Sequence, residues 1–289
     1  MKHRSISSAL LMAALGLARA APAAQQASPP AASEAAKPVA TLGEVDVSAL
    51  REVDEKPYDK IYKGMELFQR HHALAPAAAL RFRLYPRVAP LDTAGLVVKL
   101  SGDKLDQTLP LDAQLGFSLP RDAAAAAEGA FVSTNRPAKS FAWRVDVRSP
   151  GVPANARRLG DLRLECKVDL MAADLAAGIK TPAFHLLVAA GVDPCNNRGV
   201  SMLYFGERPV FGVALVAGKR RQELPAFALF GSKSPDFVAD MLDWKLLRDR
   251  LYYIPLWDES WPDDTLVELT YVDDALNGPA AAAHGQPKE

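Results

Sequence analysis

The chain has 289 residues, and its 34 basic and 34 acidic residues give a formal net charge of zero at pH 7. Three of the basic residues and none of the acids lie in the first 20 residues, so the remainder carries 31 basic and 34 acidic residues, a net charge of −3. This balance argues against a nucleic-acid binder, which shows a strongly basic patch. No stretch reaches 18 uninterrupted apolar residues, so we expect a protein that is not integral to the membrane.

The first 20 residues have the parts of a secretory signal peptide in the right order. Lys2 and Arg4 give a positively charged start, and an apolar run of ten residues follows from Ala9 to Ala18. A bilayer span needs about 20 apolar residues, so this run is too short to be one. Ala18-Arg19-Ala20 places small residues at the cleavage positions. We expect cleavage near Ala20 and a periplasmic or secreted protein; the alternative is a buried N-terminal helix.

Residues 21–54 are expected to form a disordered linker, because Ala, Pro, Gln and Ser dominate its first half and large apolar residues are nearly absent there. The stretch TLGEVDVSALRE (41–52) alternates valines with acids, which favours a short strand or a tether. Residues 43–48 also resemble the TonB box near the mature N-terminus of outer-membrane transporters. That resemblance implies a coupling partner of the TonB type.

Residues 55–170 are expected to form one helix followed by a β-sandwich-like region. Pro57 suits a helix start, and one apolar face is formed by Tyr58, Ile61, Tyr62, Met65 and Phe68. Alternating apolar and polar residues predict half-buried strands at 80–84, 141–148 and 162–170. Shorter strands are expected at 95–100, 116–119 and 129–133. Closely spaced short strands of this kind are typical of an antiparallel sandwich.

Residues 171–275 are expected to form a second β-rich region, either a separate half or part of the same domain. Continuous apolar runs predict central strands covered on both faces at 183–190, 200–205 and 209–217, with further strands at 227–230 and 265–272. Ser234-Pro235-Asp236 is a helix start, so a helix is expected over 235–250. The tail at 276–289 is expected to be disordered. The predicted fold class is mainly β, an antiparallel β-sandwich-like core with one or two peripheral helices.

Cys166 and Cys195 are the two cysteines of the chain. An even number of cysteines in an exported protein predicts one structural disulfide. Closing this loop of 29 residues would stabilise the fold by about 3–4 kcal/mol. The alternative is a reactive thiol or a metal ligand, but neither cysteine lies in a C-x-x-C arrangement. Cys166 is expected on the apolar face of the strand at 162–170.

Common catalytic motifs are absent from the sequence: it contains no G-x-S-x-G, no H-E-x-x-H and no glycine-rich phosphate loop. The stretch Ser101-Gly102-Asp103-Lys104 matches S-x-x-K but follows a predicted strand, where a turn is expected. His185 lies in an apolar run, where a hydrogen-bonded structural histidine is favoured over a catalytic base. We therefore predict no catalytic residue, no metal ligand and no cofactor, apart from calcium in the stretch described next.

One stretch carries candidate binding residues, YYIPLWDESWPDD (252–264). Its carboxylates offer the hard oxygens that calcium prefers, although they do not follow the D-x-D-x-D-G loop. Its two tryptophans could stack on a sugar ring. The favoured alternative is a tight loop whose tryptophans fold back over the core. The candidate binding residues are Trp257, Asp258, Glu259, Trp261, Asp263 and Asp264.

The leading hypothesis is an exported cell-envelope protein, a non-enzymatic binding or assembly module whose partner is an envelope protein or a glycan. The alternative is an exported hydrolase acting on polysaccharide or peptide, with Asp258, Glu259 and His185 as candidates. Adjacent residues point in opposite directions on a strand, which counts against Asp258 and Glu259 as a glycosidase pair. A third hypothesis is a TonB-linked accessory protein that uses residues 43–48.

Overall fold

The computed structural model describes residues 53–87, 91–172, 190–198, 202–229 and 245–277. The expected signal peptide, the TonB-box-like segment, His185 and most of the expected tail lie outside these residues. The predicted helix at 235–250 also falls largely outside them. Its described part, Lys245–Arg250, is a 3-10 helix.

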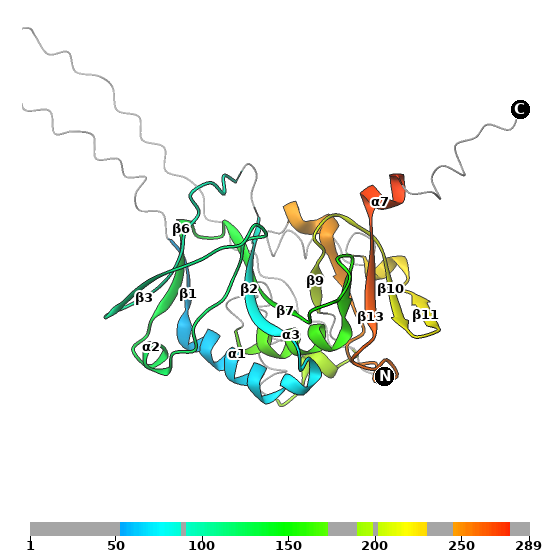
Figure 1. The fold of residues 1–289 in the computed structure, drawn as a ribbon, viewed down its shortest axis with the longest axis horizontal. Coiled ribbons are helices and arrows are strands. Elements are labelled where there is room, and N and C mark those ends of the chain that lie inside the picture. Colours follow the sequence, from blue (N-terminus) through cyan, green and yellow to red (C-terminus); the bar gives the residue numbers. More distant parts are fainter. Residues whose placement is uncertain (1–52, 88–90, 173–189, 199–201, 230–244, 278–289) are drawn as a thin grey trace, which may run out of the picture. The chain divides into compact units, whose positions relative to one another are not determined.

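The first half of the described fold consists of two antiparallel sheets and two helices (Figure 1). Its elements are β1 (Val53–Pro57), α1 (Tyr58–Arg70), a 3-10 helix (His72–Leu74), β2 (Ala79–Pro86), β3 (Val98–Gly102), β4 (Leu105–Leu109), β5 (Gly116–Phe117), α2 (Ala123–Ala127), β6 (Phe131–Pro137) and β7 (Phe141–Arg148). One sheet has the strand order β1-β6-β3-β4, and the other has the order β5-β2-β7. The predicted first helix and the predicted strands at 80–84 and 141–148 are confirmed, and the strands predicted at 95–100, 116–119 and 129–133 are present with shifted bounds as β3, β5 and β6.

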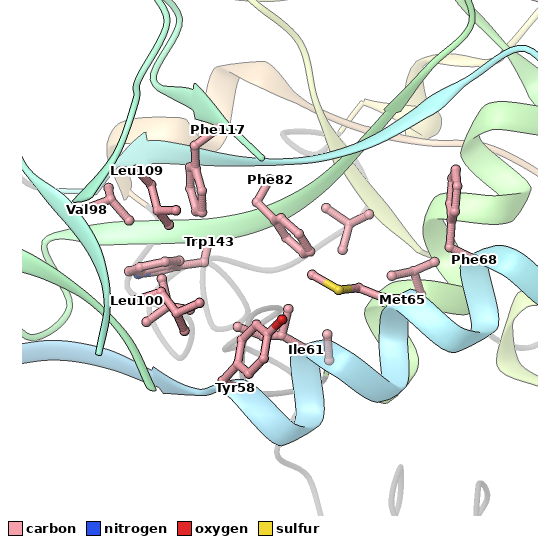
Figure 2. Packing of buried hydrophobic residues seen from close by; sticks show 14 of the residues in the cluster. Tyr58, Ile61, Met65, Phe68, Phe82, Val98, Leu100, Leu109, Phe117 and Trp143 are labelled. Atoms are coloured by element: carbon pink, nitrogen blue, oxygen red, sulfur yellow. The ribbon is translucent and has the colours of Figure 1, made fainter. Parts of the chain in front are cut away.

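The first hydrophobic core lies between α1 and the two sheets, as Figure 2 shows. Helix α1 contributes Tyr58, Ile61, Met65 and Phe68, and the strands contribute Phe82, Val98, Leu100, Leu109, Phe117 and Trp143. The buried Asp54 on β1 accepts a hydrogen bond of 2.8 Å from the indole nitrogen of Trp143. This contact fixes the start of β1, so Val53 and Asp54 belong to a strand and not to the expected linker.

The second half is built from short strands around a second core. Its elements are β8 (Ala156–Arg158), α3 (Leu159–Met171), a 3-10 helix (Pro194–Asn196), β9 (Leu203–Phe205), β10 (Val210–Ala217), β11 (Arg220–Glu223), a 3-10 helix (Ala226–Ala228), β12 (Leu251–Tyr253), β13 (Leu266–Tyr271) and α7 (Val272–Asn277). One antiparallel sheet has the order β11-β10-β13-β8, and β9 pairs with β12. With 13 strands in four antiparallel sheets, the described part of the chain is mainly β, as predicted.

Several expectations for single strands of the second half need correction. The run at 209–217 is a central strand, β10, although Phe211 on it is 62% exposed. The run at 200–205 yields β9, which is buried but lies in a two-stranded sheet. The run at 227–230 is not a strand, because it begins in a 3-10 helix and makes one isolated bridge, from Leu229 to Tyr252. The run at 183–190 lies almost wholly outside the described residues, and the strand at 265–272 is confirmed as β13.

Residues 162–170, predicted as a strand, form the helix α3 instead. The period of two in its sequence arises because the helix has two apolar faces. Leu164 and Val168 pack in the first core, whereas Leu162 and Cys166 pack in the second core. Each pair is spaced by four residues and so lies on one side of a helix. Between the two apolar faces lies a third face that carries acids.

The predicted disulfide is present and joins Cys166 of α3 to Cys195 of the 3-10 helix at Pro194–Asn196. Both cysteines are buried in the second core. The bridge therefore holds α3 against this part of the chain. Among the described residues, no helix is both long and apolar enough to cross a bilayer.

Candidate functional site

The WDESW stretch forms a loop whose second tryptophan belongs to the core. Trp261 is only 1% exposed, and the Arg220 guanidinium carbon lies 3.5 Å from the centre of its ring. Trp257 is half-buried, with the guanidinium of the exposed Arg198 at 4.3 Å from its ring centre. Guanidinium groups at this distance interact favourably with an aromatic face. One face of each indole is thus already in contact with an arginine.

The loop is held in place by hydrogen bonds from Arg163 and within the loop itself. Arg163 of α3 donates to the carbonyl oxygens of Leu256 (3.0 Å) and Asp258 (2.9 Å), and to the carboxylate of Asp263 (2.6 Å). The Asp258 side chain accepts the backbone N–H of Ser260 at 3.0 Å, and hydrogen bonding by the Ser260 side chain and backbone lowers the pKa of Asp258.

The remaining two candidates of the loop, Glu259 and Asp264, are exposed. No group of three or more metal-ligating side chains suited to an ion occurs in the part of the chain that the structure describes. A binding role for the six candidate residues stays a prediction.

A groove of about 590 Å³ lies on the outer face of the β5-β2-β7 sheet. We call it the arginine groove; it is lined by Ala79, Arg81, Arg83, Asp112, Gln114, Gly116, Asp146, Arg148, Ala154, Glu207 and Arg208. Successive residues of a strand point to opposite faces. On β2, Phe82 and Leu84 therefore enter the core, while Arg81 and Arg83 face the groove.

Glu207 joins the groove to the second half of the fold. Arg83 binds both oxygens of its carboxylate at 2.6 Å, and Arg148 donates to one of them at 2.6 Å. Burial alone would raise the pKa of Glu207, but the hydrogen bonds and positive charges of Arg83 and Arg148 together outweigh this effect and lower the pKa. The turn that follows β9 is therefore tied to two strands of the first half by a shared, ionised carboxylate.

A second wall of the groove is the loop before β5. Its Asp112 carboxylate pairs with Arg81 at 2.6 Å and accepts the backbone N–H groups of Gln114 and Gly116. Leu115 has a φ of 61°, which is uncommon for a residue with a side chain. Such backbone strain is concentrated at functional sites. The loop holds Asp112 and Gln114 at the edge of the groove.

At the edge of the same sheet, three acids of α3 line up against the open edge of β7. We call Asp161, Glu165 and Asp169 the carboxylate ladder. Their side chains accept the backbone N–H groups of Ser149 (2.7 Å), Val147 (3.3 Å) and Val145 (3.4 Å), respectively. Four residues of helix rise about 6.0 Å, and two residues of strand rise about 6.8 Å. The two repeats are similar enough for successive acids of the helix to reach successive N–H groups of the strand. One edge of β7 pairs with β2, and on the other edge the ladder takes the place of a neighbouring strand.

Two buried arginines pair with two acids of the ladder, while the third, Asp161, lies 3.7 Å from Arg158. Arg157 contacts Glu165 at 2.7 Å and also donates to the Val147 carbonyl, and Arg144 contacts Asp169 at 2.9 Å. Burial raises the pKa of Glu165 to about 7, against the opposing effect of Arg157. Burial likewise raises the pKa of Asp169. The ladder is thus a buried cluster in which the arginines oppose, without cancelling, the effect of burial on the pKa of Glu165 and of Asp169.

Sequence reasoning did not identify the groove or the ladder. The alternation of Arg81 and Arg83 on one strand, and of Asp146 and Arg148 on another, was a usable signal for a charged outer face. The spacing of acids at 161, 165 and 169 was a signal for one helical face, but it was hidden by the period of two.

No protein-family model matches the chain, and no curated protein and no solved structure is significantly similar to it.

Proposed function

We propose that the protein is an exported, β-rich binding module of the cell envelope, non-enzymatic, and active after loss of a leader at 1–20. The observation that carries this proposal is the buried disulfide between Cys166 and Cys195. Structural disulfides form and persist in oxidising compartments such as the bacterial periplasm. The leader-like start of the sequence supports the same location.

The arginine groove supports binding as the activity. Its volume of about 590 Å³ lies within the range of about 300–1,000 Å³ found for small-molecule sites. Its three carboxylates are each held by arginine, Asp112 by Arg81, Asp146 by Arg148, and Glu207 by Arg83 and Arg148. Groups fixed in this way suit the recognition of a polar ligand better than proton transfer.

Export is tested by expressing the whole chain in a bacterium and analysing the periplasmic fraction by intact mass after alkylation. We expect a mass that lacks residues 1–20, with no alkylated thiol, whereas the same protein reduced beforehand takes up two labels. Full-length protein in the cytoplasm with two reactive cysteines would overturn this part of the proposal. A hydrolase panel tests the other part: turnover abolished by Asp258→Ala or Glu259→Ala would show an enzyme.

A further inference from the structure

We propose that the arginine groove binds a small polar ligand through an oxyanion, a carboxylate or a phosphate, held by Arg81, Arg148 and Arg208. This inference rests on the proposed binding function and names its site and its ligand class. Arginine is well suited to such recognition, because its planar fork of N–H groups matches the oxygens of both anions.

The three arginines line the groove and have N–H groups beyond those that bind their carboxylate partners. A guanidinium has five N–H groups. Within the described residues, Arg81 uses Nη2 on Asp112, Arg148 uses Nε and Nη2, and Arg208 uses Nη1 and Nη2 on Asp274. Their side chains are 40%, 36% and 44% exposed, in that order. Each can therefore donate to a ligand without giving up its carboxylate partner.

Arg83 has a different part in the same groove. Its side chain is only 12% exposed, and Nε, Nη1 and Nη2 are all engaged, by the Gln114 carbonyl and by Glu207. It fixes the Glu207 turn, and Arg208 is the next residue in that turn. Arg83 thus holds the structure only, Arg148 both holds the Glu207 turn and presents a donor, and Arg81 and Arg208 are the more exposed donors.

The donors are held in place before any ligand arrives. A Cβ atom at Gly116 would lie 2.7 Å from the Asp112 carboxylate and 3.0 Å from Nη2 of Arg81, so this ion pair fills the space that a side chain would occupy. Arg208 is fixed by its aspartate partner and by the Tyr271 ring, whose centre lies 4.4 Å from its guanidinium carbon. Fixed donors reduce the entropy lost on binding.

The donors of the groove, more than its net charge, favour an oxyanion over a neutral ligand. Its lining carries four arginines and three acids, and Asp273 and Asp274 beside the lining pair with Arg208, so the attraction comes from guanidinium N–H groups and not from an excess of positive charge. Asp112 and Asp146 also provide acceptors for hydroxyl groups beside the arginine donors. A sugar acid or a sugar phosphate combines the oxyanion and the hydroxyl groups that this lining can satisfy.

The test is calorimetric titration of the whole exported protein with three matched probes: glucose, glucuronate and glucose 6-phosphate. Glucose lacks the oxyanion, whereas glucuronate carries a carboxylate and glucose 6-phosphate a phosphate ester at position 6. We expect at least one of the acids to bind more than about tenfold more tightly than glucose, and the tighter acid identifies the oxyanion. A hydrogen bond between charged groups strengthens binding by enough to change the dissociation constant about tenfold. Arg81→Gln and Arg208→Gln, which each remove one such donor, should therefore each weaken the binding of that acid about tenfold.

Arg221→Gln is the matched control, because Arg221 is 49% exposed, pairs with Glu223 of β11 and Glu268 of β13, and is not part of the groove lining. Its affinity should equal that of the wild type. Binding of both acids no tighter than that of glucose, or equal losses in Arg81→Gln and Arg221→Gln, would overturn the inference. The titration does not depend on where the protein is located in the cell. Failure to bind the acids would therefore overturn the groove inference without affecting the proposal of export, and a cytoplasmic protein that binds the acid would refute export alone.

Discussion

Replacing Glu165 with alanine removes the middle carboxylate of the ladder, and burial sets the size of the effect. Arg157, which is 5% exposed, would lose its partner at 2.7 Å, and breaking a buried pair in this way costs about 3–5 kcal/mol. The Val147 N–H would also lose its acceptor, which costs about 1–3 kcal/mol. The two losses share one site and are not additive, so we expect about 4 kcal/mol, a large part of a typical stability of about 5–15 kcal/mol.

The assay is urea denaturation followed by tryptophan fluorescence at pH 8, above the raised pKa of Glu165, with Asp59→Ala as control. Asp59 pairs with Lys63 one turn along α1, and both side chains are exposed, so this variant should lose only about 0.3–0.5 kcal/mol. Glu165→Gln keeps an oxygen acceptor and should lose less than Glu165→Ala, which supplies a measurable variant if the alanine protein does not fold. Losses below about 1 kcal/mol in both Glu165 variants would refute the reasoning about the ladder.

Three further predictions concern the same region. Burial raises the pKa of Glu165 from 4.5 to about 7, so the folded state binds more protons than the unfolded state between these pH values. The free energy of unfolding should therefore be higher at pH 5 than at pH 8. A Glu165→Gln protein that keeps the full difference between the two pH values would contradict this assignment. Gly160→Ala places a Cβ 2.1 Å from the Leu74 carbonyl oxygen, so calorimetric melting should show a loss of more than about 3 kcal/mol, and a wild-type melting temperature would show that the contact is relieved. The buried Tyr252 hydroxyl has no hydrogen-bond partner in the described part of the chain, so Tyr252→Phe should change stability by less than about 0.5 kcal/mol in urea; a loss above about 1 kcal/mol would indicate an ordered water at this hydroxyl.

The elements that sequence analysis predicted well are those that bury one face. Helix α1 shows a single apolar stripe, and β2 and β7 alternate against the same core, so each pattern has one physical cause. The disulfide followed from the number of cysteines and the expected compartment. Helix α3 was mistaken for a strand because it packs against two cores at once, which no single period represents.

The arginine groove was not predictable from the sequence, because tertiary contacts assemble it. Arg83 and Glu207 are separated by 124 residues, and Arg81 and Asp112 by 31 residues. Each of these charges alone is typical of a solvated surface. In the WDESW stretch, the residue types indicated a binding loop or a core plug, and only the packing of Trp261 and the arginines on both indoles distinguishes their roles.

The most direct measurement is ligand-induced stabilisation of the whole exported protein, compared among the wild type, Arg81→Gln and Trp257→Ala. The probe is the tighter of glucuronate and glucose 6-phosphate, at 100 times its dissociation constant for the wild type. The groove account predicts a gain of about 2.7 kcal/mol in the wild type and in Trp257→Ala, and of about 1.4 kcal/mol in Arg81→Gln if its affinity is tenfold weaker. A full gain in Arg81→Gln together with its loss in Trp257→Ala would place the ligand on the WDESW loop and contradict the account.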